Sequence, residues 1–356
     1  MTADHAGRRD RLRGQLPEHL AGRVLVLTDL ANVRYLSGFS GSNAVLVIDP
    51  GGTDLLATDG RYRDQAAEQS PDLPVMIDRN TLGAVAEAIA NRAIAVEGSL
   101  SIAEADALRA SGHDVAVATE LVERLRMVKD EVELAAVSCA CAITVEALGI
   151  LVTEMRPGVS ELRLARRLEQ LFGELGAEDR AFETIVGSGP NSAIPHHEPG
   201  SRVLATGDLV VVDAGARVDG YHADMTRTFV VGDTVLPWQE EIHALVLASQ
   251  AAATAGYLPG ATLPDVDALA RDIIDAAGYA EQFGHGLGHG VGLQIHEAPM
   301  IGTRATGTLE GNMAITVEPG VYLTGRGGVR IEDTLVVTDA GPRVLTEAPR
   351  GLVAVG

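Results

Sequence analysis

Two hydrophobic patterns alternate along the second half of the chain. Consecutive apolar residues, many of them β-branched, form short runs at Leu209–Val212, Phe229–Val231, Ala314–Val317 and Leu335–Val337. Runs of this length and composition are typical of buried strands. Between them, residues 161–172 and 263–274 repeat apolar positions at helical spacing, and Ser160 and Thr262 precede them as N-caps. The pattern predicts a mixed α/β architecture.

The helical and strand patterns occur as two copies of one unit. Pro157-Gly158 and Pro259-Gly260 each precede a capped amphipathic helix. A glycine-rich stretch follows in each copy, then a histidine-acid-proline cluster, then two apolar runs; these segments are residues 185–192, 196–199 and 209–231 in the first copy and 284–292, 296–299 and 314–337 in the second. Two copies of one unit imply a pseudo-symmetric domain with a shared central cleft. The repeat is too long for a solenoid.

Each copy predicts a hairpin that carries two acidic residues. Asp213 and Asp224 are nearly equidistant from an Asp219-Gly220 turn, so we expect them to meet across the ladder. Glu318 and Glu332 are equidistant from Gly325. An acidic residue in a strand is ordinarily solvent-facing. Asp213 and Glu318, however, end buried runs, where an unpaired charge costs several kcal/mol. Facing pairs in such places predict a site for divalent cations.

The glycine-rich stretch Gly284–Gly292 contributes candidate imidazoles. His285 and His289 would align on a helix, but alternating glycines disfavour a helix by about 1 kcal/mol each relative to alanine. The glycines indicate backbone that bends closely around a ligand, although histidines in such loops are often structural. No register matches G-x-G-x-x-G, so dinucleotide binding is not supported.

The first third of the chain predicts a separate small α/β domain. Val24–Leu27, Ala44–Ile48 and Leu55–Ala57 have strand character and alternate with helical stretches. The boundary is expected near residues 124–129, where Asp130 and Glu133 resemble a helix-capping pair. The predicted domains are residues 1–125 and 126–356.

Composition narrows the class of protein. The chain has 356 residues, 46% of them hydrophobic, and a formal net charge of −21, which argues against nucleic acid or an anionic membrane surface as a partner. No apolar run is expected to span a membrane, and the charged N-terminal stretch predicts no signal peptide. Two cysteines, Cys139 and Cys141, are expected to be buried packing groups, which fits a reducing cytoplasm.

Together these motifs resemble the pita-bread metallopeptidases, specifically the aminopeptidase P and prolidase branch that cleaves before proline. The resemblance rests on Asp224-Met-Thr-Arg, Gly288-His-Gly-Val-Gly-Leu, Val317-Glu-Pro-Gly and Arg330-Ile-Glu-Asp, and in the N-terminal part on Asn32–Ser42 and Thr58–Arg63. It covers essentially the whole chain. It implies an α/β (α+β) fold, with a small creatinase-like N-terminal domain and a pseudo-two-fold pita-bread catalytic domain.

The resemblance also implies roles for individual residues. Asp213 would bind one metal, Asp224 and Glu332 would bridge two, and His289 and Glu318 would complete the second. His196, His285 and His296 match the substrate and proton-transfer histidines, Arg330 matches a site-orienting arginine, and Phe182 stands where relatives place an aromatic wall for proline. Glu318 is the expected proton shuttle. His197 follows His196 where many relatives have another residue, so its role stays open.

The implied function is a cytoplasmic, dinuclear Xaa-Pro peptidase acting on short proline-containing peptides. Oxygen ligands with one imidazole favour Mn(II), with Co(II) or Zn(II) as alternatives. A homodimer is expected, in which the small domain caps the neighbouring cleft. Aminopeptidase and strict dipeptidase action stay open. The alternatives are a methionine-aminopeptidase-like exopeptidase, which the extra N-terminal domain disfavours, and a non-catalytic pita-bread binding module, which the full ligand set disfavours.

Overall fold

The computed structural model describes residues 3–356 and divides into two compact units. The first ends at Arg126 and the second runs from Met127 to Gly356. Each has its own hydrophobic core and is described by itself below.

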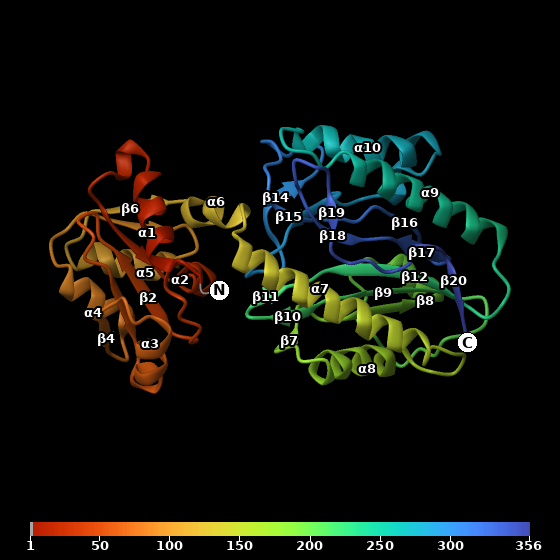
Figure 1. Ribbon diagram of the computed structural model, residues 1–356, viewed down its shortest axis with the longest axis horizontal. Coiled ribbons are helices and arrows are strands. Elements are labelled where there is room, and N and C mark those ends of the chain that lie inside the picture. The colour runs from red at the N-terminus through yellow and green to blue at the C-terminus, as the bar shows by residue number, and fades with distance from the viewer. Residues whose placement is uncertain (1–2) are drawn as a thin grey trace. The chain divides into compact units, whose positions relative to one another are not determined.

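The first unit is one six-stranded sheet with helices around it (Figure 1). The strand order is β4-β3-β2-β1-β5-β6, with β2 antiparallel to both β1 and β3 and the other pairs parallel. Its strands are β1 (Val24–Leu27), β2 (Ala44–Ile48), β3 (Leu55–Thr58), β4 (Val75–Ile77), β5 (Ile94–Glu97) and β6 (Val115–Ala118). Its helices are α1 (His5–Gly14), α2 (Leu30–Ser37), α3 (Arg63–Gln69), α4 (Thr81–Ala88) and α5 (Ile102–Ala110), with 3₁₀ turns η1 (Glu18–Leu20) and η2 (Gly60–Tyr62). Helix α6 (Leu121–Met127) ends one residue beyond the boundary between the units.

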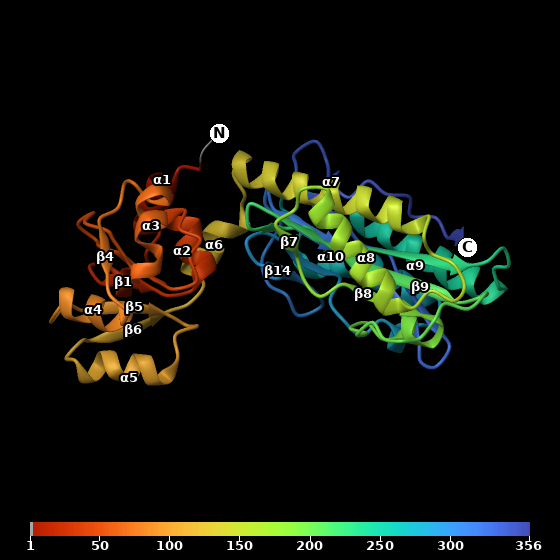
Figure 2. The ribbon, with the colours of Figure 1, turned by 90° about the horizontal axis from the view of Figure 1, so that it is seen from below.

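The second unit begins with two helices that pack on a mostly antiparallel sheet. Helix α7 (Glu131–Val152) lies against α8 (Glu161–Glu174), and both cover the sheet β20-β12-β9-β8 (Figures 1 and 2). The strands of this sheet are β8 (Ile185–Ser188), β9 (Leu209–Ala214), β12 (Met225–Val231) and β20 (Val353–Val355). A small second sheet joins β7 (Asp179–Arg180), β10 (Ala216–Val218) and β11 (Tyr221–His222), and the turn η3 (Gly189–Ala193) follows β8.

The other half of this unit repeats the arrangement on the opposite side of the strands. Helices α9 (Pro237–Ala255) and α10 (Leu263–Ala276) pack on the sheet β14-β13-β15-β18-β19 (Figure 1). Its strands are β13 (Gly288–Gly290), β14 (Glu297–Ile301), β15 (Ala314–Val317), β18 (Asp333–Val336) and β19 (Arg343–Val344). The hairpin β16 (Gly320–Leu323) and β17 (Gly327–Arg330) and the turn η4 (Ala280–Gln282) complete it.

The caps predicted from the repeat are present. The Ser160 hydroxyl accepts the Arg163 N–H at the start of α8, and the Thr262 hydroxyl accepts the Asp265 N–H at the start of α10. At α7, Asp130 and Glu133 form the expected reciprocal capping box. Local sequence therefore sets where three of the four long helices begin. The mixed α/β fold class is confirmed.

The two acidic hairpins differ in register. Val317 opposes Asp333 and Gly320 opposes Arg330, so Glu318 and Glu332 lie at opposed positions between those pairs, as predicted. In the first hairpin the turn falls at Asp219 and Gly220, both with positive φ, also as predicted. Asp213, however, opposes Thr226 rather than Asp224. The expectation that the two aspartates face each other was wrong by two residues, so they are diagonal neighbours.

Helix α7 departs from two expectations. Its 22 residues, which include an 18-residue stretch with a mean hydropathy of 2.1, are long and apolar enough to cross a membrane by length and composition, although no such run was expected. Its buried face, including Val137 and Ala140, packs against Tyr221 and Ala223, which is how the core helix of a folded unit behaves. Cys141 is buried in that face, whereas Cys139 is exposed, contrary to the prediction.

Candidate metal centre

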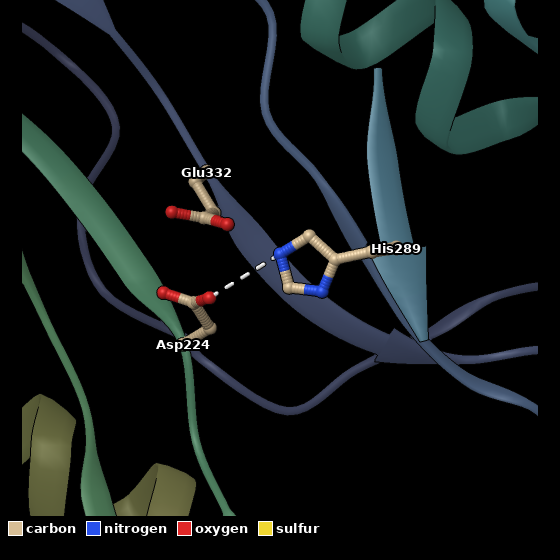
Figure 3. A group of neighbouring side chains, drawn as sticks. All are labelled: Asp224, His289 and Glu332. Atoms are coloured by element: carbon tan, nitrogen blue, oxygen red, sulfur yellow. Dashed lines mark ion pairs between the residues drawn. The ribbon is translucent and has the colours of Figure 1, made fainter. Parts of the chain in front are cut away.

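Four acidic side chains and one imidazole come together from different strands of the second unit. Asp213 lies near the end of β9 and Asp224 just before β12, while Glu318 follows β15 and Glu332 precedes β18. His289 is the central residue of β13. Figure 3 shows Asp224, His289 and Glu332 pointing toward one another, and one candidate ligand atom from each of these three lies within 4.8 Å of the others.

The hydrogen bonds of His289 leave one ring nitrogen facing the carboxylates. Its Nδ1 lies 3.0 Å from the Gly290 carbonyl, so the ring N–H is donated there and Nε2 keeps its lone pair. Burial lowers the pKa of His289 to about 4, so the ring is neutral at pH 7. Nε2 is 3.5 Å from Asp224 Oδ2 and 3.5 Å from Glu318 Oε1. A lone pair directed at two ionised carboxylates is repulsive unless a cation or a proton lies between them.

The carboxylates themselves are held where their charge is unfavourable. Burial and the neighbouring Glu332 raise the pKa of Asp224 well above its usual range, and burial with Glu318 does the same for Glu332. Burial raises the pKa of Glu318 to about 8. Asp213 Oδ1 and Asp224 Oδ1 are buried and have no hydrogen-bond partner. Native proteins seldom leave such atoms unpaired, so this donor set fits divalent cations.

Arg330 orients this cluster from one side. Its Nη2 donates to Asp213 Oδ2 at 2.6 Å, and its Nε donates to the Thr226 hydroxyl at 3.0 Å. Thr226 in turn donates to Glu332 Oε2 at 2.7 Å. Arg330 is 3% exposed, and although burial would lower its pKa, Tyr322 and Asp213 hold it well above the usual value. One fixed positive charge therefore positions carboxylates on two hairpins.

Three histidines, His196, His285 and His296, line the site. His285 Nδ1 donates to the Gly286 carbonyl at 2.8 Å, and its Nε2 lies 3.0 Å from the Tyr322 hydroxyl. Burial and Arg330 lower the pKa of His285 to about 4. The His296 ring stands edge-on to His289, with 4.4 Å between ring centroids, and burial and His196 lower the pKa of His296. The side chains of both His196 and His296 are exposed. His285 and His296 are therefore neutral near pH 7 and can donate or accept a proton.

These groups share one cavity of about 480 Å³. All ten site residues predicted from the sequence line it: Phe182, His196, Asp213, Asp224, His285, His289, His296, Glu318, Arg330 and Glu332. Apolar side chains, including Ile295 and Met300, also line the cavity. A cavity of this size accommodates a short peptide rather than a folded protein.

Two members of the network, Thr226 and Tyr322, were not predicted from the sequence. Thr226 links Arg330 to Glu332, and Tyr322 accepts a hydrogen bond from Arg330 Nη1 at 2.9 Å while contacting His285. Hairpin register could have found both. Thr226 opposes Asp213, and Tyr322 is two residues from Gly320, which opposes Arg330.

Comparison with known proteins places this geometry in a family. Residues 135–339 match the model of metallopeptidase family M24, and residues 8–128 match the creatinase/prolidase N-terminal domain. The chain belongs to metallopeptidase family M24. It is therefore a metallopeptidase, and the resemblance inferred from its motifs is confirmed.

Relatives and solved structures in this family are similar over nearly the whole chain. An Xaa-Pro dipeptidase of Pyrococcus furiosus is 34% identical over 97% of this chain and 99% of its own. The structure of an Xaa-Pro dipeptidase from Bacillus anthracis matches with a TM-score of 0.95, at 35% identity over 99% of this chain and 100% of that one. An X-Pro aminopeptidase from Thermotoga maritima matches with a TM-score of 0.88, at 34% identity over 98% and 100% of the two chains.

Proposed function

We propose that this M24 metallopeptidase is a dinuclear exopeptidase that hydrolyses the bond between an N-terminal residue and proline in short peptides. The observation that carries the proposal is the lone pair of His289 Nε2, which faces the buried carboxylates at a peptide-sized cavity. The two similar structures named above, a dipeptidase and an aminopeptidase, support specificity for proline at the second position.

Five side chains would hold the metal ions. Asp213 would bind one ion, Asp224 and Glu332 would bridge both, and His289 and Glu318 would complete the second. Oxygen donors with one imidazole favour Mn(II), with Co(II) and Zn(II) as the alternatives. When bound, such a pair of ions lowers the pKa of water and polarises a carbonyl oxygen.

The remaining steps fall to the chain's own side chains. Burial raises the pKa of Glu318 and so makes its carboxylate a stronger base. In its ionised form Glu318 would take a proton from water and then give it to the proline nitrogen that leaves. His285 and His296, with His196, would bind the substrate and stabilise charge on the carbonyl oxygen. Arg330 would hold Asp213 in place through its 2.6 Å hydrogen bond. Phe182 would form a wall for the proline ring.

We also propose an oligomeric state, a role for each domain and a cellular compartment. Residues 1–125 would form a homodimer contact and cap the cleft of the neighbouring subunit, which limits substrate length, and residues 126–356 would be the catalytic domain. The exposed Cys139 and the buried Cys141 are free thiols, which fits the reducing cytoplasm.

Cleavage of Xaa-Pro dipeptides and Xaa-Pro-Xaa tripeptides in the presence of Mn(II) tests the substrate class. Cleavage of either before proline supports the proposal, and the ratio of the two rates separates dipeptidase from aminopeptidase action. If both are inert while a peptide with N-terminal methionine is cleaved, the methionine-aminopeptidase alternative holds. If the protein cleaves none of these peptides, the result favours the alternative of a non-catalytic binding module.

Glu332→Ala tests the bridging role. We expect turnover to be abolished and bound metal to fall from two ions per chain in the unmodified enzyme, because Glu332 would contact both. The variant should stay folded, which circular dichroism and the fluorescence of the single tryptophan, Trp238, can check. Full activity in this variant would contradict the proposed ligand set.

A further inference from the structure

His197 has a different environment from its neighbour His196. His196 lines the cavity. His197 instead directs Nε2 to Glu161 Oε2 at 2.9 Å, and its side chain is 14% exposed. The two consecutive imidazoles therefore lie in different places: His196 lies at the cavity, and His197 lies against the first residue of α8.

Glu161, the partner of His197, collects several donors from one segment of chain. It is the first residue of α8 and is 0% exposed. Its carboxylate accepts the Ser188 N–H and hydroxyl, each at 2.7 Å, the Asn191 amide at 3.0 Å and the Gly200 N–H at 3.3 Å. One buried carboxylate thus ties together both ends of residues 188–200, the segment that carries His196.

The Glu161 carboxylate is held in its charged form. Burial alone would raise its pKa, but hydrogen bonds from His197 and Ser188 outweigh burial and keep the pKa below its usual value. Hydrogen bonds to an ionised carboxylate are stronger than those between neutral groups. The His197 contact is therefore a firm anchor for the backbone on which His196 stands.

A second anchor holds the same segment from the side of the metal centre. Arg330 Nη1 and Nη2 approach the Pro195 carbonyl at 3.4 and 3.5 Å, and Arg330 also binds Asp213. Pro195, His196 and His197 are consecutive, so His196 is fixed between an anchor at the carboxylate cluster and one at α8. Because neighbouring Cα atoms are only about 3.8 Å apart, we expect release of either anchor to shift His196.

We infer that His197 is a positioning residue, whose hydrogen bond to Glu161 holds His196 in the orientation that the peptidase reaction needs. This inference rests on the proposed function, since His196 is given a role there toward the substrate. His197 itself does not contact the peptide. Its effect on turnover passes through His196, and this separates it from a residue that only stabilises the fold.

A double-mutant cycle with His196 tests this assignment. With an Xaa-Pro dipeptide and Mn(II), His197→Leu should lower kcat by about 10- to 100-fold, the range expected when a reacting group is displaced by ~1 Å. In a His196→Ala background the same change should lower kcat less than twofold, because the residue on which it acts is gone. Loss of stability alone would reduce kcat by equal factors in both backgrounds.

Rescue by a matched side chain provides the control. His197→Gln keeps an N–H donor at about the reach of Nε2, so its kcat should stay within about threefold of the unmodified enzyme. If His197→Leu does not fold, as judged by Trp238 fluorescence, His197→Asn replaces it, since its amide is polar but stops short of Glu161. Equal activity of the Gln and Asn variants would overturn the inference, as would equal losses in the two backgrounds.

A measurement that does not depend on peptidase activity tests the positioning role of His197 separately. If the unmodified enzyme cleaves no Xaa-Pro peptide, the proposed function is wrong. The nitrogen resonances of the His196 ring, measured by NMR in the Mn-free protein, then decide the positioning claim. A shift of these resonances in His197→Leu but not in His197→Gln supports it, and unchanged resonances in both variants overturn it.

Discussion

At the scale of single residues, the site concentrates carboxylates where only protons or cations make them stable. Asp224 is 5% exposed and Glu332 is 2% exposed, and burial together with repulsion from neighbouring carboxylates raises the pKa of both. In the metal-free protein they are sources of instability, and in the proposed function they would become ligands of bound ions. Function and metal-free stability are therefore opposed at these positions, as is usual for active sites.

Asp224→Asn should separate these two properties. Without metal, we expect the variant to be more stable, because a neutral amide avoids the repulsion that burdens Asp224. The unfolding midpoint should rise by at least ~2 °C, which corresponds to about 1 kcal/mol for a unit of this size. Metal binding and peptidase activity should both be lost. Calorimetry of chelator-treated protein measures the unfolding midpoint. A midpoint lower than that of the unmodified protein would contradict the expected stabilisation.

Glu318 predicts a pH dependence of metal-free stability. Its folded pKa is about 8 because of burial, well above the value of an unfolded glutamate. The folded state therefore holds a proton that the unfolded state has released. Stability from this group is fully present below the unfolded pKa, near 4.5, and is lost as pH rises through about 8. His285 and His289, with pKa values lowered to about 4, change stability below pH ~6.5, so the test belongs above it.

Chelator-treated protein should accordingly lose about 1–2 kcal/mol of unfolding free energy between pH 6.5 and 8, from a slope of up to ~1.4 kcal/mol per pH unit. Denaturant titrations at several pH values measure this slope. Glu318→Gln is the matched control, because it removes one of the titrating carboxyl groups and should make the profile less steep. A profile unchanged by Glu318→Gln would show that other groups account for the slope.

At the scale of secondary structure elements, local signals predict more than long-range ones. The caps at Ser160 and Thr262 and the turn at Asp219-Gly220 depend on neighbouring residues only, and the structure contains them. The offset between Asp213 and Asp224 was not predicted, because counting from a turn ignores the separate β10–β11 ladder between them.

Contacts between segments that are distant in the sequence could not be predicted either. The hydrogen bond from His197 to Glu161 joins residues 36 apart, and no periodicity signals it. His289 was identified because its glycine-rich surroundings and family motif mark it locally. Register and pairing between distant elements depend on how whole layers pack, which a single sequence does not display.

One glycine shows how closely the elements at the site approach each other. A Cβ on Gly288, in β13, would lie 2.1 Å from the backbone oxygen of Thr316 in β15. A backbone oxygen cannot move aside, so Gly288→Ala should push β13 and its His289 away from the carboxylates. We expect Mn(II) affinity to fall at least tenfold, measured by calorimetric titration. At Gly284 a Cβ meets nothing within 4 Å, so Gly284→Ala should bind as before; equal losses in both would contradict this account.

At the scale of the whole molecule, the candidate metal site lies in one of the two units. Within residues 3–356, the candidate metal group Asp224, His289 and Glu332 lies entirely in the second unit, and so do the residues of the cavity. The first unit has a separate core, which includes Val26 of β1 and Val96 of β5. A ligand stabilises only the structure that must open for the ligand to leave. Metal binding should therefore act on the two units unequally.

Hydrogen exchange can measure that difference. Mn(II) at about 100 times its dissociation constant stabilises the native state by ~2.7 kcal/mol. Amides of β9, β12, β13 and β15 that exchange through opening of the second unit should then exchange about 100-fold more slowly than in chelator-treated protein. Amides of β1, β2 and β5 should be unaffected, and Glu332→Ala should show no slowing with Mn(II). Equal slowing in both units would mean that they open together, and the metal would then stabilise the chain as a single cooperative structure.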